Sequence, residues 1–241
     1  MSPAIAHSPG STIYQTKAYL RLVVLYATNH DCMWLRPFWT ERLERLWKGR
    51  SVARPSEVSR TTIANYLSIL ETTFVAHVVR PYSTGKIAEI VAAPKVYGFD
   101  TGFVCYFRGW HEPRRDDMGL LWEHYVLNEL HARLQTRRIN YWRDKQGHEV
   151  DFVLARRGQP PLAIECKWSA NDFDAKSLKA FAARYPKAQH FVVAQDVDRA
   201  YNKHFDSLEV RFSSLNAFVE RVEGESGPIN SEPLSLASRQ H

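Results

Sequence analysis

Hydrophobic residues recur at helical intervals in the first part of the chain, whereas strand and helix patterns alternate in the second part. Residues 14–28 and 38–48 show helical spacing, and a third helix is predicted after Ser59, which can serve as its N-cap. The apolar positions of this third helix follow at three- and four-residue steps and are Ile63, Tyr66, Leu67, Leu70 and Phe74. Two short strands are predicted to follow it, in residues 73–82 and 94–99.

From residue 100 onward the pattern predicts a short helix in residues 100–110 and a long amphipathic helix in residues 118–135. The elements predicted after them are strands in 139–142, 148–155 and 162–168, a helix in 174–185, strands in 190–194 and 208–212, and a helix in 214–222. This order predicts an α/β (α+β) fold. Residues 1–11 and 224–241 are rich in Ser, Pro and Gly, and we expect both ends to be disordered.

Three helices followed by a two-stranded ribbon are typical of a winged helix-turn-helix domain, which we place at residues 12–99. The helix after Ser59 would be the recognition helix. Its polar face carries Arg60, Thr61, Thr62 and Asn65, whose side chains suit contacts to phosphates and base edges. The alternative is that any amphipathic helix has a polar face of this kind.

The distribution of charge favours an anionic partner for this first domain. The net charge is +6. Residues 1–99 hold 12 basic residues (Lys or Arg) and 6 acidic ones (Asp or Glu), whereas residues 100–241 hold 20 basic and 20 acidic residues. DNA is therefore the first partner to consider, although a solvated surface would also explain the excess. Three widely spaced cysteines and the lack of a signal peptide or membrane-length apolar run predict a cytoplasmic protein without membrane contact.

Gly85 and Lys86 superficially suggest a phosphate loop. That motif needs a further glycine where this chain has Arg80, and Ser or Thr where it has Ile87. No other stretch of the sequence matches the motif, so no ATPase activity is expected.

Residues 149–168 predict a hairpin that brings charged side chains together. Pairing about Gly158 places Val153 opposite Ala163 and Asp151 opposite Glu165. Lys167 lies two residues beyond Glu165 and shares its face, whereas Cys166 points to the other face and is expected to be a buried small hydrophobe.

Two facing carboxylates repel each other unless a positive charge lies between them. Lys167 can supply this charge, and so can a hard divalent cation such as Mg²⁺ or Mn²⁺. A further acid, Glu123, is in line with the leucine stripe of the long helix, which consists of Leu127, Leu130 and Leu134. A carboxylate there is either functional or lies at the end of the stripe and reaches water.

A helical Glu, then Asp, then Glu-x-Lys resembles the signature of the PD-(D/E)XK nuclease superfamily, and the order of elements in residues 118–194 resembles its αβββαβ core. More narrowly, the stretches APKVYGFDTG, GLLWEHYVLNEL, YWRDKQGHEVDFVL and AIECKW resemble a prokaryotic family. In that family an AAA+ ATPase module is followed by a winged helix and a C-terminal nuclease-like domain of unknown function. The resemblance covers roughly residues 55–195.

The resemblance implies a restriction-endonuclease-like domain in residues 100–223. Asp151 and Glu165 would hold Mg²⁺, Lys167 would assist the attacking water, and Glu123 would complete the acidic cluster. It thus implies a Mg²⁺-dependent DNA nuclease, with a separate ATPase module as a partner because this chain lacks one. The alternatives are a non-catalytic DNA-binding or partner-binding module and a remnant of a larger ATPase.

Two further groups of polar residues lie near the predicted hairpin. Arg143 and Lys145 stand beside Tyr141 and Trp142 and would contact a nucleic-acid backbone, or else be solvated charges beside core aromatics. The histidines show no metal-ligand spacing. We expect four of them to lie at the surface or just behind the site: His111, His124, His131 and His148.

Overall fold

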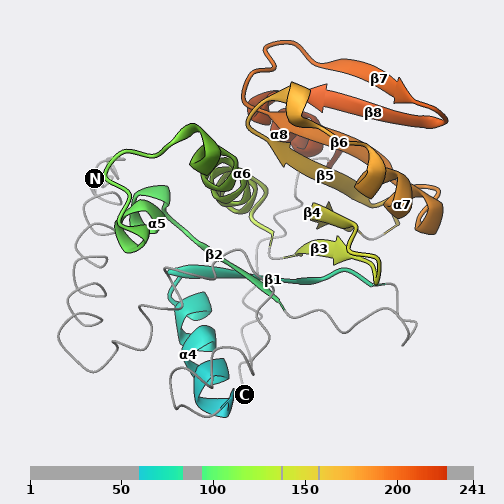
Figure 1. Cartoon of the computed structure of the whole chain (residues 1–241). Coiled ribbons are helices and arrows are strands. Elements are labelled where there is room, and N and C mark those ends of the chain that lie inside the picture. The colour runs from blue at the N-terminus through green and yellow to red at the C-terminus, as the bar shows by residue number, and fades with distance from the viewer. Residues whose placement is uncertain (1–59, 84–93, 137, 157, 227–241) are drawn as a thin grey trace, which may run out of the picture. The chain divides into compact units, whose positions relative to one another are not determined.

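The computed structural model describes residues 60–83, 94–136, 138–156 and 158–226, which form a mixed α/β fold as predicted (Figure 1). The helices predicted in residues 14–28 and 38–48, the cap Ser59 and the segment 1–11 lie outside the described residues. The described residues divide into two compact units. The first unit holds residues 60–79 and 94–113, and the second holds residues 80–83 and 114–226.

The first unit contains two helices and an antiparallel pair of strands. Helix α4 (Arg60–Thr72) leads into β1 (Ala76–Pro81), which pairs with β2 (Lys95–Gly98), so the predicted two-stranded ribbon is confirmed. Helix α5 (Thr101–Arg108) begins after Asp100, whose carboxylate accepts the N–H of Phe103 at 2.9 Å. It ends at Gly109, where a φ of 67° suits a residue without a side chain.

The second unit contains every helix and strand predicted from residue 111 onward, and one strand that was not predicted. Its elements are the 3₁₀ helix η3 (Arg115–Asp117), α6 (Met118–Leu134), β3 (Ile139–Arg143), β4 (Glu149–Leu154), β5 (Leu162–Lys167), the 3₁₀ helix η4 (Ala170–Asp172), α7 (Lys176–Arg184), β6 (Gln189–Ala194), β7 (Tyr201–Phe205), β8 (Leu208–Ser213) and α8 (Leu215–Ser226). Strand β7 was not predicted because four of its five residues are exposed and show no alternation of burial. Helix α8 extends three residues into the segment 224–241 that we expected to be disordered.

The strands of the second unit form one mixed sheet in the order β3-β4-β5-β6-β8-β7. Strands β3, β4 and β5 are antiparallel, β5, β6 and β8 are parallel, and β7 returns antiparallel along β8. Arg80 and Pro81 at the end of β1 pair in parallel with Asn140 and Tyr141 of β3. None of the helices in the described residues is long and apolar enough to span a bilayer.

Helices cover both faces of this sheet. Leu178 and Phe181 of α7 pack against Val153, Ala163 and Val192 in one buried cluster. Helix α6 packs against β5 and α8, and Phe218 of α8 meets Phe191, the neighbour of Val192 on β6. Because neighbouring strand residues point to opposite faces, α7 covers one face and α6 with α8 covers the other.

The predicted register of the β4–β5 hairpin is confirmed. Val153 pairs with Ala163, and the neighbouring pairs are Phe152 with Ile164 and Leu154 with Leu162. Gly158 has a φ of 74°, a conformation in which a side chain would be strained. Alternating hydrophobicity and this glycine are local features, and together they are sufficient to fix the register.

Candidate functional site

Asp151 joins β4 to β5 through its side chain rather than through the strand ladder. The paired residues of these strands end at Phe152 and Ile164, one step before Asp151. The Asp151 carboxylate accepts the backbone N–H of Cys166 at 2.9 Å. This bond holds the carboxylate beside the last residues of β5, where Glu165 and Lys167 lie.

Lys167 connects the two acids that the sequence predicted to face each other. Its Nζ donates to Glu165 at 2.8 Å and lies 4.0 Å from the nearest carboxylate oxygen of Asp151. The side chains of Glu165, Asp151 and Lys167 are 6%, 16% and 26% exposed. Burial alone lowers the pKa of Lys167, but the attraction of Asp151 and Glu165 outweighs it and raises the pKa well above its ordinary value.

Cys166 is buried between these residues, as predicted. Burial raises the pKa of its thiol well above the ordinary value, and the charges of Asp151, Glu123 and Glu165 add to this shift while Lys167 opposes it. Glu123 therefore lies close enough to act on the same thiol as the three hairpin residues. The four residues singled out from the sequence belong to one electrostatic neighbourhood.

Two tryptophans hold the helix that carries Glu123 against the end of β5. Trp122 precedes Glu123 on α6, and its Nε1–H donates to the carbonyl of Val193 at 3.0 Å. The ring of Trp122 meets that of Trp168, which follows Lys167, edge to face with centroids 6.1 Å apart. Sequence analysis gave these tryptophans no role, although their positions next to Glu123 and Lys167 were a usable signal.

Asp151, Glu165 and Lys167 form what we call the carboxylate cluster, and its two carboxylates fit a metal site with two protein ligands. Within the part of the chain that the structure describes, no three His, Cys, Asp or Glu side chains are placed together to hold a metal ion. The charge of Glu123, on α6, acts on the same thiol as these acids. Asp151 and Glu165 form a two-carboxylate donor set, which suits Mg²⁺ because this ion is commonly bound by one or two carboxylates plus waters and phosphate oxygens.

The residues predicted to contact DNA are divided between the two units. Arg60, Thr61, Thr62 and Asn65 are on α4, and the side chain of Asn65 is exposed. Arg143 ends β3 with its guanidinium 3.5 Å from Glu149, and Lys145 is exposed in the turn between β3 and β4. This turn lies at the same end of the hairpin as Asp151.

Of the two positions predicted for the histidines, at the surface or just behind the site, the structure excludes the surface for His124. His124 is fully buried on α6, with its Nδ1 at 3.0 Å from the carbonyl of Leu120, because position 124 falls on the core-facing side of the helix. His148 lies 2.6 Å from Asp144, and both residues belong to the β3–β4 connection near the cluster.

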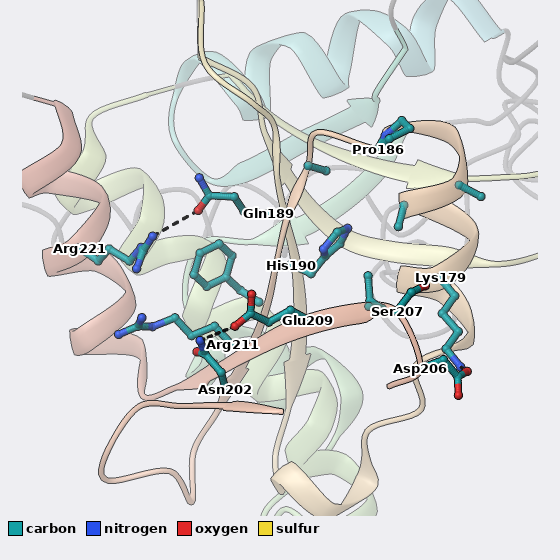
Figure 2. Close-up of a pocket in the computed structure, with 15 residues that line it drawn as sticks. Lys179, Pro186, Gln189, His190, Asn202, Asp206, Ser207, Glu209, Arg211 and Arg221 are labelled. Carbon is teal, nitrogen blue, oxygen red and sulfur yellow. Dashed lines mark hydrogen bonds and ion pairs between the residues drawn. The ribbon is translucent and has the colours of Figure 1, made fainter. Parts of the chain in front are cut away.

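A groove that no sequence feature indicated lies elsewhere on the second unit (Figure 2). It has a volume of about 810 Å³ and is lined by residues of α7, β6, β7, β8 and α8. Its residues are far apart in sequence, and a single-sequence pattern carries no signal for such a feature.

The sequence matches two family models. Residues 118–212 match the model described as "Domain of unknown function (DUF4143)", and residues 20–114 match the one described as "Domain of unknown function (DUF8612)". The first match ends at residue 114 and the second begins at residue 118, close to the change of unit after Pro113 in the sequence, whereas residues 80–83 belong to the second unit and fall within the range 20–114. The chain is thus similar to two domain families over separate parts of its length.

Two mycobacterial proteins are similar to part of the chain. They are "Uncharacterized protein Mb2031c" of Mycobacterium bovis and "Uncharacterized protein Rv2008c" of Mycobacterium tuberculosis, each 28% identical over 140 residues. The match covers 56% of this chain and 32% of each relative. The chain therefore spans about a third of the length of the curated relatives that it matches.

Proposed function

We propose that the second unit is a nuclease of the PD-(D/E)XK type that hydrolyses DNA phosphodiester bonds with Mg²⁺ or Mn²⁺. The observation that carries this proposal is the position of Lys167, whose Nζ lies 2.8 Å from Glu165 and 4.0 Å from Asp151. An Asp from one strand and a Glu-x-Lys from the next thus lie close together, which supports the proposal.

The order of elements gives a second, independent support. Helix α6, strands β3, β4 and β5, helix α7 and strand β6 follow one another in the αβββαβ order of a restriction-endonuclease-like core. The candidate residues lie at the end of β5 and near the start of β4. The element order by itself would not carry the proposal, because nuclease-like folds also exist without catalysis.

In this proposal Asp151 and Glu165 hold the metal ion, and Glu123 contributes negative charge beside them. When bound, Mg²⁺ would polarise the phosphoryl oxygen and lower the pKa of an attacking water. Lys167 keeps its proton because its pKa is raised, so its ammonium can hydrogen-bond that water or the developing negative charge on the phosphate. The N–H of Cys166 fixes the orientation of the Asp151 carboxylate.

The first unit would bind the DNA in a winged-helix manner, with α4 as recognition helix and β1–β2 as wing. Arg60, Thr61, Thr62 and Asn65 would contact the duplex, and Arg143 and Lys145 would contact its backbone nearer to the cluster. The 12 Lys and Arg against 6 Asp and Glu in residues 1–99 support a nucleic-acid partner. The relatives are about three times as long as the matched part, so their remaining length is sufficient for an AAA+ ATPase module of the kind that the resemblance implies. We place the protein and this partner in the cytoplasm.

DNA cleavage by substituted proteins tests this function. The full chain is incubated with single-stranded and duplex DNA and with Mg²⁺ or Mn²⁺, beside Asp151→Ala and Glu165→Gln. Glu220→Gln is the matched control, because Glu220 is an exposed residue of α8. We expect cleavage by the parent and the control and a loss of at least about a hundredfold in the other two. No cleavage at all, or equal cleavage by all four proteins, would overturn the catalytic proposal.

One observation favours a second candidate, a DNA-binding or partner-binding module without catalysis. Lys167 neutralises the same two carboxylates that a metal ion would need, so the cluster is also complete as a buried ion pair that stabilises the hairpin. In this case DNA or an ATPase would bind without cleavage, and Mg²⁺ would not stabilise the protein against heat. A metal-dependent rise in Tm that Glu165→Gln abolishes would contradict this second candidate.

A further inference from the structure

The lining residues of the groove in Figure 2 include no member of the carboxylate cluster. In the β5–β6 ladder, Lys167 pairs with Ala194 at one end, and Leu162 pairs with Gln189 at the other. The groove residues on β6 are Gln189, His190 and Phe191, and Phe191 is three residue steps of about 3.3 Å, or roughly 10 Å, from Ala194, the strand partner of Lys167. Asp151, Glu165 and Lys167 do not line the groove.

One end of the groove carries two arginines around a buried aromatic ring. The guanidinium of Arg221 lies over the ring of Phe191, 5.6 Å from its centre, and Arg211 is the strand partner of Phe191 on β8. Figure 2 shows both arginine side chains on the same side of the groove. Arg221 donates a hydrogen bond to the side-chain oxygen of Gln189 at 3.3 Å and forms an ion pair with Glu225 at 3.0 Å. Arg211 makes no side-chain hydrogen bond or ion pair with any residue of the described ranges.

The acids of the groove already have partners. Asp206 is ion-paired with Lys179 at the opposite end, and Glu209 accepts a hydrogen bond from Asn202 at 2.7 Å. Burial lowers the pKa of His190, so this imidazole is neutral at pH 7 and adds no charge. Arg211 is thus a cation of the groove whose charge is available to a ligand.

The wall formed by α7 and the segment after it is apolar. It consists of small side chains, which are Ala182, Ala183, Pro186 and Ala188. A volume of about 810 Å³ is within the range of small-molecule sites. Cations at one end and small apolar side chains along a wall suit a ligand with an anionic head and a flat, less polar body.

We propose that this groove binds a nucleotide phosphate, with Arg211 and Arg221 as the phosphate-binding residues and the alanine wall beside the base or sugar. Guanidinium groups match phosphate oxygens in fork geometry, and an arginine without a counter-ion gains most from such a bond. The phosphate can belong to a free nucleotide or to a nucleic-acid chain, since both present the same group. The proposal does not rest on the carboxylate cluster or on its proposed nuclease activity.

Binding is measured by calorimetric titration of the full chain in EDTA, with Asp151→Asn present in every protein so that the carboxylate cluster does not contribute. The probes are inorganic phosphate, adenosine, adenosine monophosphate, adenosine diphosphate and a short single-stranded oligonucleotide. We expect a phosphate-bearing nucleotide or the oligonucleotide to bind and adenosine to bind weakly. Arg211→Gln and Arg221→Gln should each weaken binding about tenfold or more, whereas exposed Arg199→Gln should not change it.

A second variant tests the groove without removing a charge. Ala183 is exposed on α7, so Ala183→Phe should leave the protein folded while its ring fills the groove and prevents binding. If free nucleotides bind, and Arg211→Gln, Arg221→Gln and Ala183→Phe weaken this binding, the groove is a nucleotide site. If only the oligonucleotide binds, the phosphate comes from a nucleic-acid chain. The proposal is overturned if no phosphate-bearing probe binds, or if binding survives Ala183→Phe and is equal in Arg211→Gln and Arg199→Gln.

Discussion

Lys167 holds together two carboxylates that would otherwise repel each other at the end of the β4–β5 hairpin. Its ammonium is hydrogen-bonded to Glu165 and lies 4.0 Å from Asp151. Sequence alternation predicted that these residues share a face, because it depends only on the period of a strand. The alternation could not predict the hydrogen bond from the backbone N–H of Cys166 to the Asp151 carboxylate, because this bond depends on where the paired residues of the two strands end.

The first prediction concerns this ammonium. Lys167→Met should lower the free energy of unfolding by about 2 kcal/mol, because two partly buried carboxylates lose their cation. The folded-state pKa of Lys167 is raised well above its ordinary value, so the contribution of Lys167 to stability is fully present below about pH 10 and is lost only as the pH rises through the folded-state pKa. Urea unfolding between about pH 6 and pH 9 should show a constant difference from the parent. Exposed Lys187→Met is the control, and a difference that already falls between pH 7 and pH 9 would contradict the assignment.

The second prediction concerns the thiol between the acids. Because burial and the neighbouring carboxylates raise its pKa, Cys166 should react with iodoacetamide at least about tenfold more slowly than partly exposed Cys105. Mass spectrometry of peptides from the native protein measures both rates, and labelling in urea should make them similar. Equal rates in the native protein would show that Cys166 is neither buried nor protonated as described.

At the scale of elements, the hairpin was predictable and the edge of the sheet was not. Gly158 and the alternation on both sides of it fixed the pairing of Val153 with Ala163. Strand β7 has four exposed residues out of five, so its sequence lacks the buried-exposed alternation by which strands are identified. Its existence depends on pairing with β8, which is a tertiary contact.

The third prediction compares one substitution at two glycines. Gly158→Ala should destabilise the protein by about 1 kcal/mol, because φ is 74° there and a side chain is strained. Gly119→Ala should be neutral or stabilising by up to about 1 kcal/mol, because Gly119 is helical and an added Cβ meets no atom within 4 Å. Thermal unfolding of both variants checks the opposite signs, and the same sign in both would contradict the backbone assignment of the hairpin turn.

At the scale of the whole molecule, the second unit is completed by a segment that precedes part of the first unit in sequence. The N–H of Tyr82 donates to the carbonyl of Tyr141 at 2.6 Å, and its ring lies 5.2 Å from that of Tyr185. The family model that matches residues 118–212 does not include this segment, which lies within the range 20–114 matched by the other model.

The fourth prediction tests this contribution. Tyr82→Ala should lower the free energy of unfolding by about 2 kcal/mol, because its ring packs against the core that α7 forms with the sheet. Tyr106→Ala is the control, since Tyr106 is 66% exposed and should change stability by less than about 0.5 kcal/mol. Urea unfolding followed by tryptophan fluorescence measures both. An equal effect of the two substitutions would show that residue 82 is not part of the second unit.

The sequence by itself determined the helices and strands after residue 100 apart from β7 and the two 3₁₀ helices, the hairpin register, and the four charged residues of the candidate site, because periodicity and turn chemistry are local. Tertiary structure decided the rest. It brings the charge of Glu123 to the thiol of Cys166, ties α6 to β6 through Trp122, and forms the groove that Arg211 and Arg221 line. These features join residues from distant parts of the chain, and their positions follow from packing across the sheet, which no local pattern records.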